Sequence, residues 1–267
     1  MVVASLIKQI AAIPVVAFIF TVGTLQILEI RTLFEPPFLF FILNVVFIFL
    51  ASIVVAFLSA KAYLQDGSLV FLYLTCAVLF FACAVIPSGL LIAPPGGPNV
   101  AVTIYNTGAL MSSIFHALGA TLVTLGVTAS VSRLRRTRLV LVLLGAPLFT
   151  LLITVASLQG ITPVYFVQGQ GPTLVRQVVI GAATALFAIS SLLFMRVYSK
   201  SKIDTLFWYS LALALSAIGM YALFVTKATG SPQAWAGRSA VYVAGVYFLV
   251  SVLTTVRATR AGGTQSH

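Results

Sequence analysis

The chain has 267 residues, of which 61% are hydrophobic and 7% are charged, and it carries a formal net charge of +11. A soluble domain has roughly 25% charged residues, so this composition excludes a protein whose surface faces water on all sides. The mean hydropathy of +1.14 is that of an integral membrane protein.

Eight apolar segments follow one another along the chain, and each has the about 20 residues that a membrane-spanning helix needs. They cover residues 5–28, 37–60, 68–93, 104–130, 138–160, 175–200, 203–226 and 233–256. Their apolar runs are continuous, whereas the strands of a membrane barrel alternate in polarity over about 10 residues. The sequence therefore predicts an all-α fold, a polytopic membrane bundle of eight transmembrane helices.

The segments are separated by short stretches rich in proline and glycine, such as residues 94–98 and 169–172. No stretch between them is long enough for a folded soluble domain, so we expect a single transmembrane domain over residues 1–257 and a short cytoplasmic tail over 258–267. The first segment lacks the small-residue cleavage pattern of a signal peptide and is predicted to be a retained helix.

The 15 lysines and arginines are distributed unevenly between the two predicted sides of the membrane. One side carries Lys8, Lys61, Arg133, Arg135, Arg136, Arg138, Arg196, Lys200, Lys202, Arg257 and Arg260, and the other carries Arg31, Arg176, Lys227 and Arg238. Because cytoplasmic loops hold the excess of positive charge, the first side is predicted to be cytoplasmic, and both termini lie on it. The protein is expected to be a multi-pass protein of the cell membrane. The basic stretch at 133–138 is then expected to face anionic lipid headgroups, and no nucleic-acid partner is expected.

Residues that could bind a metal or haem, transfer protons or form a disulfide within the membrane are scarce. Cys76 and Cys83 are seven residues apart, about 10 Å along a helix, which is too far for a disulfide. His116 is the one histidine inside a predicted span, and the four acidic residues lie at span ends or in loops. This pattern argues against a bis-histidine haem, a metal site and a proton pathway, and Lys227 lies too close to a helix end for a retinal site. We expect neither a catalytic site nor a cofactor.

The fourth segment is the most informative. Small and polar residues, from Asn106 through Ser112, Ser113 and His116 to Ala120, share one face of the predicted helix, and bulky apolar residues share the opposite face. His116 lies about 18 Å from the predicted outer end of this segment, near the membrane midplane. Two interpretations remain open: a hydrogen-bonded histidine that ties two helices together, or a residue that lines a ligand pocket.

Other polar residues are predicted near the outer half of the bundle. The residues proposed for a ligand pocket are His116, Asn106, Asn44, Ser113, Arg238 and Tyr242. Glu29, at the end of the first segment, is the expected partner of Arg238 or Arg31. Together these residues predict a polar cavity that opens outward and receives a small ligand of unknown identity.

Three stretches carry a family resemblance: "AYLQDGSLVFLYLTCAVLFFA", "NVAVTIYNTGALMSSIFHALGA" and the final "WAGRSAVYVAGVYFLVSVLTTVRA". They resemble the MASE-like multi-helix membrane sensor domains of bacterial and archaeal sensor histidine kinases and diguanylate cyclases. The resemblance spans nearly the whole chain and implies an eight-helix signal-input domain in which Asn44, Asn106, His116 and Arg238 are the matching polar positions. It also implies a cytoplasmic kinase or cyclase as output partner.

The chain departs from those sensors after its last span, where only residues 257–267 follow. It is expected to be either a free-standing input module or an excised fragment, and a homodimer is a further expectation. Two other functions stay open: a small transporter or permease, and an accessory subunit of a membrane complex. Pro87 and Pro147, each inside a predicted span, are the positions at which a transporter helix would be interrupted.

Overall fold

The computed structural model describes residues 2–30, 32–36, 38–93, 96–127, 132–167, 171–226, 228 and 230–263. Its helices are α1 (Val2–Leu28), α2 (Leu39–Asn44), the π-helical η1 (Val45–Leu50), α3 (Ala51–Asp66), α4 (Leu69–Leu90), α5 (Gly97–Thr124), the 3-10 helix η2 (Ser132–Leu134), α6 (Arg135–Leu158), α7 (Leu174–Ser201), α8 (Asp204–Val225) and α9 (Pro232–Gly263). Strands β1 (Phe166–Val167) and β2 (Gly171–Pro172) pair in antiparallel fashion.

Within the described residues, eight helices are long and apolar enough to cross a membrane, with α2, η1 and α3 forming one continuous span. The prediction of an all-α bundle of eight spans is therefore confirmed. Two predicted boundaries, Pro37 and Ser130, lie outside the described residues, as do Arg31, Lys227 and the end of the predicted tail at 264–267.

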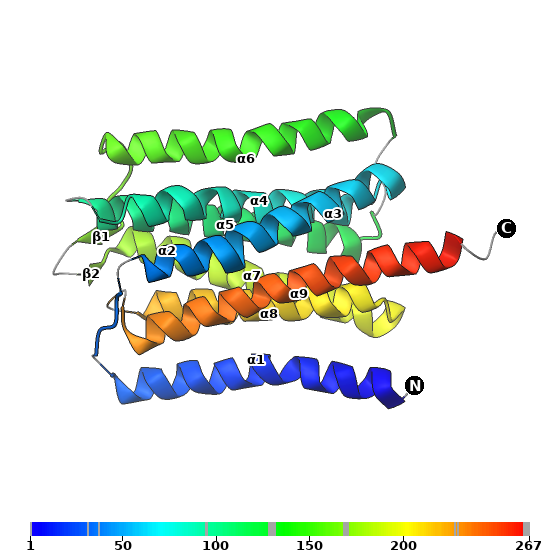
Figure 1. The fold of residues 1–267 in the computed structure, drawn as a ribbon, viewed down its shortest axis with the longest axis horizontal. Coiled ribbons are helices and arrows are strands. Elements are labelled where there is room, and N and C mark those ends of the chain that lie inside the picture. The colour runs from blue at the N-terminus through cyan, green and yellow to red at the C-terminus, as the bar shows by residue number, and fades with distance from the viewer. Residues whose placement is uncertain are drawn as a thin grey trace.

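The eight spans differ in how deeply they are buried (Figure 1). Helices α1 and α6 lie at opposite edges of the bundle, and only 11% and 17% of their most apolar windows are buried. Helices α4 and α8 lie inside, with 78% and 67% buried. α4 packs on α5, and α8 packs on α7 and α9. The edge helices thus present apolar side chains to lipid, while α4, α5, α8 and α9 form the core.

Close approaches between the core helices depend on glycine. A Cβ atom on Gly219 of α8 would lie 2.7 Å from the carbonyl oxygen of Gly237 on α9, and one on Gly237 would lie 2.9 Å from the carbonyl oxygen of Gly219. A Cβ on Gly245 of α9 would lie 2.7 Å from the carbonyl oxygen of Phe47 in η1. Because lipid supplies no hydrophobic force between helices, such backbone-to-backbone packing is a principal source of association in membranes.

The two ends of the bundle differ in charge. Figure 1 shows both termini at one end and the β1–β2 hairpin at the other. At the end with the termini, Lys8 forms a salt bridge of 2.6 Å with Asp204, and Arg135 donates to the carbonyl oxygen of Gln65 at 3.2 Å. Arg176 lies near the hairpin, in the first turn of α7, and Arg238 lies near the start of α9. The predicted charge asymmetry is thus a difference between the two ends of the bundle.

Helix α5 begins and ends earlier than the sequence indicated. It starts at Gly97 instead of residue 104, because Pro98 fits the first turn, where a backbone N–H has no helical partner. It ends at Thr124, and Gly126 follows with a positive φ of 76°. His116 is therefore 19 residues, roughly 28 Å, from the hairpin end of its helix and 8 residues from the other end. It lies in the half nearer the termini, not midway as the predicted start implied.

Candidate functional site

His116 is held by side chains from three other helices. It is 1% exposed, and its Nδ1 shares a hydrogen bond of 2.8 Å with the hydroxyl of Tyr209 on α8. Its ring stacks on Phe248 of α9, with centroids 5.1 Å apart and planes 5° apart, and Phe187 of α7 lies at 5.7 Å. His116 thus connects α5 to α7, α8 and α9.

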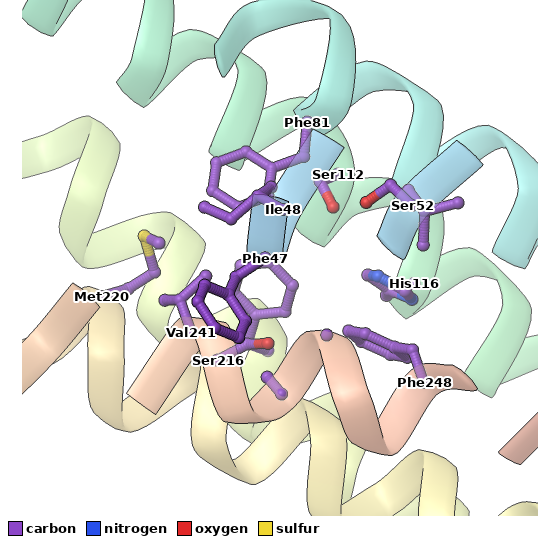
Figure 2. A pocket seen from close by; sticks show the side chains of 14 residues that line it. Phe47, Ile48, Ser52, Phe81, Ser112, His116, Ser216, Met220, Val241 and Phe248 are labelled. Atoms are coloured by element: carbon purple, nitrogen blue, oxygen red, sulfur yellow. The ribbon is translucent and has the colours of Figure 1, made fainter. Parts of the chain in front are cut away.

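The cavity beside His116 is small. Figure 2 shows the imidazole lying over the ring of Phe248, with Ser52 and Ser112 on the side away from Phe248. The cavity measures about 30 Å³, which accommodates a water molecule, whereas ligand pockets measure roughly 300–1,000 Å³. Of the two interpretations of His116, the geometry favours the hydrogen-bonded tie between helices.

Asn44 and Tyr242 form a second tie. The Tyr242 hydroxyl donates to Asn44 Oδ1 at 2.9 Å and so joins the end of α2 to α9. The Tyr242 ring stacks on Phe47 of η1, with centroids 5.4 Å apart. Ser113, by contrast, bonds within its own helix, to the carbonyl oxygen of Leu110 at 2.7 Å. Neither Asn44 nor Ser113 lines the cavity beside His116 or the two cavities at the hairpin end of the bundle.

Replacing Tyr242 with Phe tests this second tie. Tyr242→Phe should lower the free energy of unfolding by about 0.6 kcal/mol, and by no more than about 1.7 kcal/mol, the range measured for interhelical hydrogen bonds in membranes. Unfolding of the purified protein in mixed micelles with increasing dodecyl sulfate measures it. Tyr221→Phe is the matched control, because the Tyr221 hydroxyl bonds Gln26 at an exposed position. Equal losses in the two variants would contradict a structural role specific to Tyr242.

Arg238 and Asn106 lie away from His116, at the end of the bundle that carries the β1–β2 hairpin. Together with Tyr105, Arg176 and Ser88 they line a cavity of about 60 Å³, which we call the inner compartment. Their side chains come from α4, α5, α7 and α9. Phe40, Ile92, Val102 and Arg238 also line a larger neighbouring cavity of about 550 Å³, which we call the outer chamber. The two cavities share these four residues and together form the outer site.

The local structure of two helices brings both arginines to the inner compartment. Arg176 lies in the first turn of α7, where its backbone N–H donates to the N-cap hydroxyl of Thr173 at 3.4 Å. Its Nη2 donates to the carbonyl oxygen of Leu223 at 2.9 Å. Leu223 is in the last turn of α8, where carbonyl groups have no hydrogen-bond partner within the helix. The Arg176 guanidinium supplies the missing donor for this carbonyl oxygen.

The Arg238 guanidinium lies between aromatic rings. Its carbon atom is 4.0 Å from the ring centroid of Phe40 and 5.2 Å from that of Trp235. The Glu35 carboxylate lies close enough for its charge to act on Arg238, and the pairing of Glu29 with Arg238 or Arg31 stays a prediction. Glu35 lines the outer chamber. Two hydrogen bonds of the preceding residue, Phe34, fix this segment. The Phe34 N–H donates to the carbonyl oxygen of Gly230 at 2.9 Å, and the Phe34 carbonyl oxygen accepts from Trp235 Nε1 at 2.8 Å.

Several donors in the inner compartment have no partner among the described residues. They are Asn106 Nδ2, Arg176 Nε and the hydroxyl of Tyr105. Leaving such a group buried and unpaired costs about 1–3 kcal/mol. The compartment is therefore suited to a ligand that brings acceptor oxygens.

The sequence had indicated Asn106 and Arg238 but not Tyr105, Arg176 or Ser88. In the sequence, Arg176 is only one of the cations on the predicted outer side, because its position close to a proline–glycine stretch is that of an ordinary interfacial residue. An arginine in the first turn of a span, three residues after a threonine cap, is the signal that the sequence offers. The thiols of Cys76 and Cys83 are both free, and no three His, Cys, Asp or Glu side chains come together in the part of the chain described.

No protein-family model matches the chain, and no curated protein and no solved structure matches it either.

Proposed function

We propose that this multi-pass membrane protein is a signal-input module: it binds a small or lipophilic ligand in the outer site and passes a displacement of α9 to a cytoplasmic kinase or cyclase. One observation carries the proposal. Helix α9 contributes Arg238 to both cavities of the outer site and continues without a break to Gly263, at the opposite end of the bundle (Figure 1). A ligand held by Arg238 therefore contacts a single continuous helix that leaves the bundle at the end where the basic residues lie.

The surroundings of α9 support a sliding or tilting movement. At Gly219, Gly237 and Gly245 the backbone of α9 closely approaches α8 and η1. The neighbouring η1 is π-helical, and such turns occur frequently at functional sites. A ligand shifts the equilibrium between two positions of α9 only as far as it binds one position more tightly than the other. The contact between the ligand and Arg238 must therefore be stronger in one position of α9.

The charge of the two ends supports the orientation that signalling needs. The end with the termini carries most of the described lysines and arginines, and the positive-inside rule assigns such an end to the cytoplasm of a cell-membrane protein. The resemblance to MASE-like input domains agrees with this arrangement, since in those proteins the last helix leads to the output domain.

The proposal is tested in two steps on the purified full chain in lipid nanodiscs. A thermal-shift screen against small amphiphiles of negative, neutral and positive charge first finds a compound that stabilises the wild type. Spin labels at Leu253→Cys on α9 and Lys200→Cys on α7, in a Cys76→Ala/Cys83→Ala background, then report the position of α9 by pulsed electron resonance. We expect the bound compound to shift the distance between the labels by about 1–2 Å, as in other helix displacements.

The label pair Arg136→Cys and Lys200→Cys, on α6 and α7, is the control and should not respond. Binding without any change in the α9 distance would overturn the signalling proposal. Accumulation of the compound inside sealed vesicles would do the same in favour of a transporter. A screen in which no compound of any charge stabilises the protein would count against a ligand-binding module altogether.

A further inference from the structure

The inner compartment of the outer site is cationic and rich in donors. Arg176 and Arg238 are 8% and 7% exposed, and Tyr105 and Asn106 are 7% and 3% exposed. Among the residues that the structure describes, no acidic side chain lines this compartment, and Glu35 is the one carboxylate that lines the outer chamber. Two guanidinium groups against one carboxylate leave one positive charge at the site.

Three buried polar atoms of this compartment have no partner among the described residues, and each is able to donate a hydrogen bond: Arg176 Nε, Asn106 Nδ2 and the Tyr105 hydroxyl. A ligand with acceptor oxygens satisfies all three, and an anionic one also compensates the remaining charge. Guanidinium groups match the paired oxygens of carboxylate and phosphate better than any other common ligand group. A cationic ligand would meet two buried guanidinium cations in this compartment.

The outer chamber has the opposite character. It is lined largely by apolar and aromatic side chains, among them Phe38, Phe41, Phe166 and Trp235. Its volume of about 550 Å³ falls within the range of small-molecule pockets, and it adjoins the cationic compartment at Arg238. The site as a whole has a charged inner end that fits a small headgroup and an apolar outer end that fits a hydrocarbon body.

We infer that the outer site binds an amphiphile with a single anionic oxygen headgroup, a carboxylate or a phosphate, placed between Arg176 and Arg238, with its apolar body in the outer chamber. The inference rests on the proposed function only in that both use the outer site. Asn106 and Tyr105 orient the headgroup, and Phe40 and Trp235, which flank Arg238, separate it from water.

The test uses Trp235 as a reporter. The full chain carrying Trp208→Phe, with Trp235 as its one tryptophan, is placed in nanodiscs of neutral phosphatidylcholine and titrated with brominated dodecanoate, whose bromine quenches nearby indole fluorescence. We expect saturable quenching that intact dodecanoate reverses, and an affinity about tenfold or more above those of dodecanol and dodecylamine. Equal competition by the carboxylate, the alcohol and the amine would overturn the inference.

Variants locate the headgroup. Arg176→Gln and Arg238→Gln should each weaken dodecanoate binding about tenfold or more, because each leaves the anion short of one buried cation. Arg136→Gln removes the same charge from the opposite end of the bundle and should leave binding unchanged. Arg176→Lys and Arg238→Lys, which keep the charge, should recover part of the affinity if the glutamine variants fold poorly. Unchanged binding in folded Arg176→Gln and Arg238→Gln proteins would overturn the assignment.

Two competitors separate the sources of such a ligand, and displacement by either supports the inference. Octanoate stays in the aqueous phase, so stronger displacement by octanoate indicates a soluble extracellular carboxylate. Lysophosphatidate stays in the bilayer, so stronger displacement by it indicates a single-chain membrane lipid. Dodecanoate that binds without moving the α9 label refutes signalling but leaves this inference intact. A neutral or cationic compound that binds and moves α9, while dodecanoate does not bind, refutes this inference alone.

Discussion

Tyr209→Ala is expected to lower the free energy of unfolding by about 3–5 kcal/mol, the range for a large buried aromatic side chain cut back to alanine. Tyr209 is 1% exposed and stacks on Phe194 with ring centroids 4.3 Å apart. Its hydroxyl is also the partner of His116. The substitution therefore opens a cavity where α5, α7 and α8 meet and leaves a buried imidazole nitrogen without a hydrogen bond.

The loss is measured by dodecyl sulfate unfolding in mixed micelles, and a thiol-reactive dye reports exposure of the buried Cys76 during heating. Tyr209→Phe keeps the ring and removes only the hydroxyl, so it should cost about 1 kcal/mol. Phe20→Ala is the matched control, because Phe20 is 71% exposed on the edge helix α1. A loss for Tyr209→Ala no greater than that for Phe20→Ala would show that the cluster around His116 does not hold the bundle together.

Gly219→Val is expected to force α8 and α9 apart. The first carbon of any side chain at this position would lie 2.7 Å from the carbonyl oxygen of Gly237, a backbone atom that cannot rotate away. Overpacking of this kind costs about 1–3 kcal/mol, and the two methyl groups of valine place the effect at the upper end of that range. Gly219→Ala should show a smaller loss in the same direction.

Gly145→Val is the control for this second prediction. Gly145 also lies inside a helix, α6, but a Cβ atom there would meet nothing within 4 Å. The backbone effect of replacing glycine by valine in a helix is therefore the same, and only the helix contact differs. The melting temperatures of the two variants, measured in one detergent, should diverge by several degrees. Equal melting temperatures would contradict direct backbone packing between α8 and α9.

The number of spans and their helical nature could be predicted from the sequence, because both depend on local hydropathy. The inward face of α5 was also predictable: Asn106, Ser112, Ser113 and His116 are all buried. The opposite face was less so. Phe115 lies on the face of bulky apolar residues, yet it is only partly exposed and stacks on Phe80 of α4, with ring centroids 5.0 Å apart. A helix that neighbours cover on two sides has no simple polar and apolar face.

The candidate site could be predicted only in part. The sequence joined His116, Asn44, Tyr242 and Arg238 in one pocket, whereas the structure distributes them between a small internal cavity, an interhelical hydrogen bond and the outer site. The spacing of residues along a helix indicates how deep a residue lies in the membrane and on which face of the helix it lies, but it does not indicate which helix packs against that face. Arg176 reaches the outer site through a carbonyl 47 residues away in the chain, and no local pattern contains that information.

The sequence by itself determined that this chain is a bundle of eight apolar helices with its basic residues concentrated at one end, because lipid and the positive-inside rule act on each segment separately. The tertiary structure decided which polar groups meet. Glycines set how closely α8, α9 and η1 approach one another. The packing of α5, α7, α8 and α9 brings Arg176 and Arg238 to one compartment and His116 beside Tyr209. Such contacts depend on the fit between surfaces far apart in the chain, which hydropathy does not encode.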